Sequence, residues 1–410
     1  MTLGLHFSLL VDELIRITMN KFIHIVSSPF SQRDYDRYGV AILQADGFDV
    51  EVWNVGKVVN RDAYEKTAHV SGRFEIETVF DTKNEFLESC RKQEKAFFFV
   101  AASYAFNSLF LFRELSRCGQ TLSISVSYPD SASIKAEDMD EPKFFIRNKL
   151  KLFSKFKKIS FKKISDKIIL TMPPWLFGVR YADLVFSGGD KSNFSNPLIG
   201  ANTRVVNIHA NDYDTFLENP PRGPFNDKYA VFIDQNLPFN TDPFFTKTAR
   251  VATARNYFPS LTKFFDQLEK ELRMPIKIAA HPRSNFDSIS EAFGGRELLQ
   301  GETARLINDS SLVIAHYSYA VNFAVLYRKP LMLITTDELK ASFRRSAIEA
   351  TSSHFKKDPV NVDSDEAIDW KSEMMVDSGI YDQYIFNFIK KPETPERLFW
   401  QVVGEQVDNC

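Results

Sequence analysis

The sequence predicts an α/β fold with mostly parallel sheets, and two observations carry this prediction. Short apolar runs alternate along the chain with segments of helical spacing, which is the pattern of strand–helix–strand units. The clearest example lies between residues 276 and 335, where three apolar runs are separated by polar turns and helical runs. Polar residues also gather directly after these runs, at the strand ends where parallel sheets bind their ligands.

The first half of the chain begins with a buried strand, a helix and a second strand. The turn after the first strand, Ser28-Pro29-Phe30-Ser31, lacks the glycine pattern of a dinucleotide site, so a Rossmann dehydrogenase is not expected. Gly47 follows the predicted helix 33–45 as a cap. The strands predicted in this half are 22–27, 48–54, 73–80, 96–101, 121–126, 181–186 and 204–208, and further helices are predicted at 84–91 and 105–118.

The second half begins after the Pro-rich stretch 219–224, which has the composition of a linker. Strands are predicted at 229–233, 276–280, 311–315, 330–335 and 360–362, with helices at 257–272, 321–327 and 338–350. A helix at 395–403 is predicted to return to the first domain. The expected organisation is an extension (1–18), a first domain (19–218), a linker (219–227), a second domain (228–390) and a crossing helix (391–410).

The composition is that of a soluble globular protein. The 410 residues are 44% apolar and 25% charged, with a net charge of −2, so nucleic acid is not an expected partner. The three cysteines show no metal-binding spacing, which indicates a reducing compartment. No signal peptide or membrane span is evident, and a cytoplasmic location is expected. A homodimer is compatible with the sequence, although no heptad pattern predicts one.

A basic segment interrupts this ordinary composition. Residues 143–167 hold ten Lys or Arg with Asp166 as the only acid, and aromatic and aliphatic residues are interleaved. One interpretation is peripheral contact with an anionic membrane or acceptor. The other is a solvated helical face with a normal core stripe.

Candidate site residues follow two strands of the second half. His281 and Arg283 follow one strand, and His316 and Ser318 follow the next. Histidine and arginine bring donors and charge, and Ser318 precedes a helix whose free N–H groups suit an anion. Each residue also has a purely structural interpretation: a turn histidine, a surface charge or a helix cap. On the functional interpretation, the sequence predicts that this half binds a phosphate-bearing donor.

The chain resembles glycosyltransferases of the GT-B architecture, with two Rossmann-like domains facing a central cleft and a C-terminal helix crossing back to the first domain. His281-Pro282 at a strand end, followed by Ser318 at a helix start, resembles the His-Pro and Ser/Thr motifs of bacterial sialyltransferases, polysialyltransferases and Kdo transferases. Several other stretches resemble surface-carbohydrate proteins of O-antigen and capsule loci: Arg33-Asp34-Tyr35, 48–53, 209–214, 232–242 and 309–330.

The resemblance implies an inverting transferase that uses a CMP-linked ulosonic acid and requires no metal and no cofactor beyond that donor. His281 would contact the donor phosphate and assist departure of CMP, Ser318 would bind the phosphate, and Glu302 would lie near the ribose or cytosine. Arg283 and His316 complete the expected donor site. The acceptor would be a cell-surface glycan or glycolipid.

The general base is not fixed by the resemblance, because the acidic motif of those families is missing. Asp234, at a strand end beside the predicted hinge, is the first choice, and Asp34, Asp212 and Asp242 are the alternatives. Asp212-Tyr213-Asp214 also matches the acid-x-acid pattern of metal-dependent transferases. The alternative functions are a UDP- or GDP-sugar transferase or epimerase and a non-catalytic carbohydrate-binding protein of a polysaccharide locus.

Overall fold

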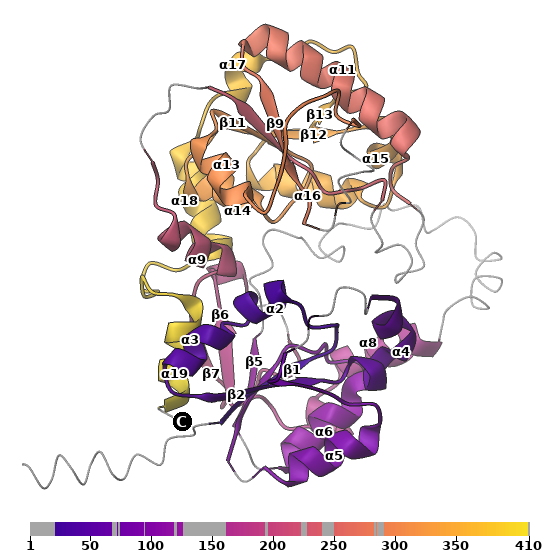
Figure 1. Cartoon of the computed structure of the whole chain (residues 1–410), viewed down its shortest axis with the longest axis vertical. Helices are drawn as coiled ribbons and strands as arrows, with labels where there is room; N and C mark the ends of the chain where they lie inside the picture. The colour runs from indigo at the N-terminus through magenta and orange to yellow at the C-terminus, as the bar shows by residue number, and fades with distance from the viewer. Residues whose placement is uncertain are drawn as a thin grey trace, which may run out of the picture.

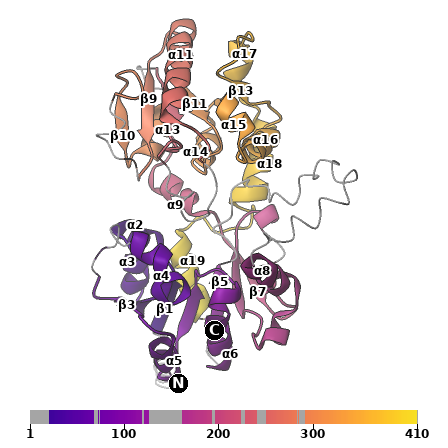
Figure 2. The same cartoon turned by 90° about the vertical axis from the view of Figure 1, so that its right-hand side faces the viewer.

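The computed structural model describes residues 21–67, 72, 74–93, 95–118, 121–125, 161–192, 196–222, 228–239, 250–282, 284 and 291–408. The predicted extension 1–18, most of the basic segment (143–160), Arg283 and Asp242 lie outside these residues. The described residues form two α/β domains stacked along the long axis of the molecule (Figures 1 and 2).

The first domain is built on a parallel sheet with the strand order β3-β2-β1-β4-β5-β6-β7, counted over the described residues. The helices α5 and α6 lie within or overlap the predicted helices 84–91 and 105–118, whereas α4 was not predicted. The helix α8 begins within the basic segment 143–167, for which a helical face was one of the two interpretations. The strands are β1 (Lys21–Val26), β2 (Asp49–Asn54), β3 (Glu77–Val79), β4 (Phe97–Val100), β5 (Thr121–Ser125), β6 (Leu184–Ser187) and β7 (Arg204–Asn207). The helices are α2 (Gln32–Arg37), α3 (Val40–Ala45), α4 (Gly56–Thr67), α5 (Lys83–Arg91), α6 (Leu109–Arg117) and α8 (Phe161–Thr171), with 3-10 turns η2 (Phe106–Ser108), η4 (Pro174–Phe177) and η5 (Asp190–Ser192).

The second domain repeats the same topology. Its parallel sheet has the order β10-β9-β8-β11-β12-β13 over the described residues. In both sheets the chain starts in the middle, winds to one edge and then reverses, which creates a switch point between β1 and β4 and another between β8 and β11. The strands are β8 (Ala230–Ile233), β9 (Ile276–Ala280), β10 (Leu298–Gln300), β11 (Leu312–Ala315), β12 (Leu331–Thr335) and β13 (Val360–Asn361). The helices are α11 (Ala254–Leu272), α13 (Thr303–Asp309), α14 (Val321–Leu326), α15 (Asp337–Ala341), α16 (Arg345–His354), α17 (Trp370–Glu373), α18 (Ser378–Tyr384) and the π-helical turn η6 (Ile385–Ile389).

The central strands are mostly apolar because helices cover both faces of each sheet, although β1 also carries the buried His24. In β1, Ile23 and Ile25 join one core cluster, while Phe22 and Val26 join the cluster on the opposite face. β8 divides its side chains in the same way between the two clusters of the second domain. These runs therefore predict strands well, but they do not show alternation of polar and apolar residues.

The chain passes between the domains twice. It leaves the first domain through α9 (Asn211–Glu218) and returns after η6 to form α19 (Phe399–Asp408), which packs on the first domain beside α3 (Figure 1). The indole Nε1 of Trp400 donates to the carbonyl of Arg37 at 2.8 Å, and Trp400 is buried among Phe22, His24 and Phe99. Two doubly wound domains, a central cleft and a returning C-terminal helix confirm the predicted GT-B-like fold.

The predicted helix 33–45 is divided into α2 and α3. Gly39 separates them with φ of 57°, a left-handed conformation that glycine adopts readily. A Cβ atom on Gly39 would lie 2.1 Å from ring atoms of Trp400. The break therefore lets the returning helix approach the first domain closely, and the prediction of one continuous helix was wrong.

Replacement of Trp400 should destabilise the first domain. Trp400→Ala removes a fully buried ring and its hydrogen bond to Arg37, and such substitutions cost about 3–5 kcal/mol. We expect a large fall in the urea midpoint of unfolding, measured by circular dichroism. Trp175→Ala is the matched control, because Trp175 is 62% exposed and its loss should leave the midpoint nearly unchanged. Equal midpoints for the two variants would contradict this role of α19.

Candidate functional site

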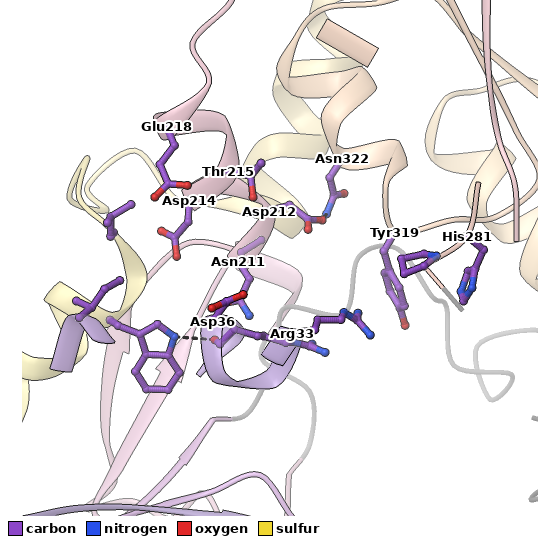
Figure 3. A pocket seen from close by; sticks show the side chains of 16 residues that line it. Arg33, Asp36, Asn211, Asp212, Asp214, Thr215, Glu218, His281, Tyr319 and Asn322 are labelled. Carbon is purple, nitrogen blue, oxygen red and sulfur yellow. Dashed lines mark hydrogen bonds between the residues drawn. The ribbon is translucent and has the colours of Figure 1, made fainter. Parts of the chain in front are cut away.

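A cavity of about 740 Å³ lies between the two domains. Figure 3 shows the side chains of α2, α9 and the second domain that converge on it. Its walls combine charged groups of both signs with apolar residues, so it suits a ligand that has both polar and apolar surface. The lining residues are Arg33, Asp36, Arg37, Ile42, Ala210, Asn211, Asp212, Asp214, Thr215, Glu218, His281, Pro282, Tyr319, Asn322, Leu398 and Trp400.

The first domain contributes two arginines from α2. Ser31 caps this short helix in a reciprocal arrangement with Asp34, whose carboxylate accepts from the Ser31 hydroxyl at 2.6 Å and from its N–H at 3.1 Å. Arg33 and Arg37 are four residues apart and therefore lie on one face of the helix, which is turned to the cavity. Asp34, an alternative base in the sequence, serves as the cap and does not line the cavity.

Helix α9 contributes a row of polar groups. Asn211, Asp214, Thr215 and Glu218 follow helical spacing and line the cavity together with Asp212. Both polar atoms of the Asn211 side chain are buried without a hydrogen-bond partner among the described residues. A buried amide of this kind is normally satisfied, so Asn211 marks a position where a ligand could donate and accept.

Asp212 connects the two domains. Its carboxylate accepts a hydrogen bond from the Asn322 amide of α14 at 2.9 Å. Burial raises the pKa of Asp212, while the Asn322 hydrogen bond and the positive charges of Arg37 and Arg33 act in the opposite direction. A carboxylate with a raised pKa in a ligand-sized cavity has the properties of a general base.

The second domain contributes His281 and Tyr319. His281 follows β9, and its backbone is fixed: its carbonyl accepts from the Gln300 amide at 2.9 Å and its N–H donates to Asp234 at 3.5 Å. Tyr319 lies between β11 and α14, and Figure 3 shows its ring beside His281 on the same wall. These positions are carboxyl ends of parallel strands, as expected for a ligand site.

The structure does not place Asp234, the first choice for the base, in the cavity. Its side chain is almost fully buried and accepts hydrogen bonds from Asn236 N–H at 2.9 Å and the Ser284 hydroxyl at 3.3 Å, besides that from His281. Burial raises the pKa of Asp234, and these donors partly offset the effect. Asp234 therefore holds the turn that presents His281, and this geometry gives it no route to an acceptor hydroxyl.

His316 lies in the core of the second domain and does not line the cavity. Its ring is fully buried, with Nδ1 at 2.7 Å from the Ile334 carbonyl and Nε2 at 3.0 Å from the Tyr257 hydroxyl. Burial lowers the pKa of His316 to about 4, which keeps the ring neutral. Both nitrogens have partners within the core, and the phosphate-binding role of His316 stays a prediction.

Ser318 and Glu302 are not among the residues that line the cavity. The Ser318 hydroxyl accepts from the Ala320 N–H at 3.2 Å, which is a turn contact next to Tyr319. Glu302 accepts from the guanidinium Nε of Arg305 at 2.6 Å at the start of α13. Their predicted roles in donor binding remain predictions.

The acid-x-acid pattern of α9 does not form a shared metal site. Asp212 is directed to Asn322, whereas Asp214 accepts from the Phe399 N–H at 2.7 Å. Across the part of the chain that the structure describes, no group of three or more His, Cys, Asp or Glu side chains could hold a metal ion.

Among the described residues, no helix is both long enough and apolar enough to cross a bilayer.

Arg37 was not identified from the sequence as a site residue. Asn211, Tyr319 and Asn322 were given no role and entered only within the stretches 209–214 and 309–330 of the family resemblance. Arg33 likewise entered only through that resemblance, although the basic residues four apart on the first predicted helix were a usable signal. Asn211 and Asn322 carry no such signal. They reach the cavity because α9 and α14 pack together, which sequence spacing does not reveal.

No known protein-family model matches this chain, and no curated protein sequence matches it. Solved structures with a similar arrangement include UDP-GlcNAc 2-epimerase from Methanocaldococcus jannaschii, at 10% identity and a TM-score of 0.46, covering 94% of this chain and 99% of that one. The wall teichoic acid polymerase TagF aligns at 11% identity and a TM-score of 0.47, covering 96% and 89%. MurG from Acinetobacter baumannii aligns at 8% identity and a TM-score of 0.45, covering 95% and 100%.

The stability of the domain junction should depend on pH through Asp214. Burial raises the pKa of Asp214 to about 6 from an ordinary value of 3.8, and His209 and the Phe399 N–H oppose the shift. The folded state thus holds this proton more tightly than the unfolded state. The contribution of Asp214 to the free energy of unfolding is complete below about pH 3.8 and is lost as the pH rises through about 6. Urea midpoints measured across this window should fall with pH more steeply for the wild type than for Asp214→Asn. Parallel curves would contradict the assignment.

Proposed function

We propose that the protein is an inverting glycosyltransferase that moves an ulosonic acid from a CMP-sugar to a cell-surface glycan acceptor. The observation that carries the proposal is that His281 of the second domain and Asp212 of α9 line the same interdomain cavity. His281 belongs to the second domain, which would bind the donor, and Asp212 lies on α9, where the first domain's arginines also reach. The resemblance of the His281-Pro282 and Ser318 positions supports the CMP-linked donor.

His281 would act on the leaving group. As the bond between the anomeric carbon and the phosphate oxygen breaks, negative charge develops on the CMP phosphate. An imidazole at a fixed strand end can donate a hydrogen bond or a proton to that oxygen. Asp234 and Gln300 hold the backbone of His281, so the turn that carries the ring is already formed before the donor binds.

Asp212 would act on the acceptor. An acceptor hydroxyl attacks the anomeric carbon from the face opposite to CMP, and its proton passes to the Asp212 carboxylate. The raised pKa of Asp212 makes its carboxylate a stronger base than that of an ordinary aspartate. Arg33 and Arg37 are the cations of the cavity and would attract the carboxylate of the donor sugar or an anionic group of the acceptor.

The donor class is tested by nucleotide binding. Thermal shifts with CMP, CDP, UDP, GDP and ADP, with and without EDTA, should show stabilisation by CMP that EDTA does not change. His281→Ala should abolish the shift. His354→Gln, a histidine outside the cavity, is the control and should retain it. Stabilisation by UDP or GDP instead of CMP would mean that the donor is a UDP- or GDP-sugar. If no nucleotide stabilised the protein, a carbohydrate-binding protein would be favoured.

The base is tested by substitution and pH. Asp212→Asn removes the proton acceptor, and kcat should fall by about 10²–10⁴-fold with little change in nucleotide binding. Because the base must be ionised and its pKa is raised, the acid limb of wild-type kcat/KM should lie above 3.8 and be missing in the variant. If Asp234→Asn instead retained the fold and lost the acid limb, Asp234 would be the base.

A further inference from the structure

The side chain of Asn211 lacks the hydrogen bonds that a buried amide normally makes. Asn211 is the first residue of α9 and lines the interdomain cavity next to the candidate base Asp212. Its Oδ1 and Nδ2 atoms are both buried, and neither has a hydrogen-bond partner in the part of the chain that the structure describes. A buried amide without partners costs free energy, so a native protein that retains one needs a reason for it.

The common structural role of an asparagine near a helix start is not filled here. Such a side chain often accepts a hydrogen bond from a backbone N–H of the first turn. α9 has no side-chain cap, and its start is held by the backbone instead, since the Ala210 N–H donates to the Ile389 carbonyl at 2.8 Å. At the other end of the same helix, the Asn219 amide does have a partner, because its Nδ2 donates to the Thr215 carbonyl at 3.0 Å. The formation of α9 therefore does not explain Asn211.

The position of Asn211 lets one ligand meet both its amide and the carboxylate of Asp212. The two residues are consecutive, and both line the cavity. Figure 3 shows Asn211 between Asp212 of α9 and Asp36 of α2. Neither amide atom has a partner to give up, so rotation about the side-chain bonds toward a ligand breaks no hydrogen bond. A ligand that bonds to the amide also removes the cost of burying it, and this gain exceeds an ordinary exchange of hydrogen bonds with water.

The chemistry of the amide selects the class of group that it binds. An amide presents an acceptor and a donor side by side, whereas an anion needs donors only and a cation needs acceptors only. Two neighbouring hydroxyls of a sugar ring match it, because one hydroxyl donates to Oδ1 and the other accepts from Nδ2. The acetamido group of an amino sugar does not match it, because the N–H and C=O of a trans amide point in opposite directions.

We propose that Asn211 binds a pair of neighbouring hydroxyls on the acceptor sugar and thereby positions the attacking hydroxyl at Asp212. The inference rests on the proposed function only in naming this sugar as the acceptor. Asn211 is then a positioning and specificity-determining residue, and the same two atoms lower the stability of the free protein and raise its affinity for the sugar. These two effects are tested by separate measurements.

The first measurement is the urea midpoint of unfolding of the full chain. Asn211→Leu replaces the amide by an apolar group of similar size, and Asn211→Ala leaves more room, so a clash of the leucine can be recognised. The midpoint of at least one of these variants should equal or exceed that of the wild type, because no hydrogen bond is lost. Asn219→Ala is the matched control on the same helix, and its midpoint should fall because a bonded amide is removed. A fall in both Asn211 variants would make the amide structural and overturn the proposal.

The second measurement is the binding of methyl glucoside and methyl galactoside, and of their 2-deoxy and 3-deoxy analogues, by ligand-observed NMR titration. The wild type and Asn219→Ala should bind a parent glycoside roughly ten-fold more tightly than either Asn211 variant does. A deoxy analogue that lacks one hydroxyl of the pair should bind equally to the wild type and to the Asn211 variants. Equal binding of the parent glycoside by the wild type and the Asn211 variants would overturn the proposal, and so would a wild type that binds none of these sugars.

Thermal shifts with CMP on the same proteins separate this inference from the proposed function. The Asn211 variants should retain the shift, and saturating CMP should leave glycoside binding to the wild type in place. If CMP did not stabilise the wild type but glycoside binding still depended on Asn211, the proposed donor would be wrong and the sugar site would stand. Displacement of the glycoside by CMP would place the sugar in the donor position and overturn the acceptor assignment.

Discussion

The geometry of the cleft depends on the bonding between the two chain segments that pass from one domain to the other. Ala210 N–H donates to the Ile389 carbonyl at 2.8 Å, and the buried His209 ring lies 2.6 Å from the Arg397 carbonyl through Nε2. A third contact is the hydrogen bond that the Asp214 carboxylate of α9 accepts from the Phe399 N–H at the start of α19. These contacts join segments that are far apart in the sequence. The junction between the domains can therefore open only if these contacts break or rearrange.

This junction explains why α9 carries both structural and candidate chemical groups. One side of the helix faces the returning chain, where the Tyr213 hydroxyl donates to Glu396 at 2.7 Å. The other side faces the cavity with Asn211 and Asp212. Because Asp212 is also bonded to Asn322 in the second domain, a change in the domain angle would change the environment, and therefore the pKa, of the candidate base. Closure and base strength are coupled by this single contact.

The sequence was sufficient for the fold because parallel strands covered on both faces are apolar runs, and their alternation with helices leaves few topologies. It also placed His281 directly after a strand of such a sheet, and His281 is among the residues that line the cavity. Asp234 and His316 have the same sequence position relative to their strands, yet neither of them lines the cavity. What separates them is the direction of the side chain: the Asp234 carboxylate is used by the turn of His281 and the His316 ring by the core, and neither use is encoded in spacing.

The charges of the cavity act on one another as well as on a ligand. Burial raises the pKa of Asp212, and the positive charges of Arg33 and Arg37 oppose that shift. Partial exclusion of water strengthens this interaction, because charges interact more strongly in a medium of low dielectric constant. A ligand carboxylate that paired with the two arginines would offset part of their charge, and the pKa of Asp212 would then rise further. The cavity therefore couples the charge of a bound ligand to the strength of the candidate base.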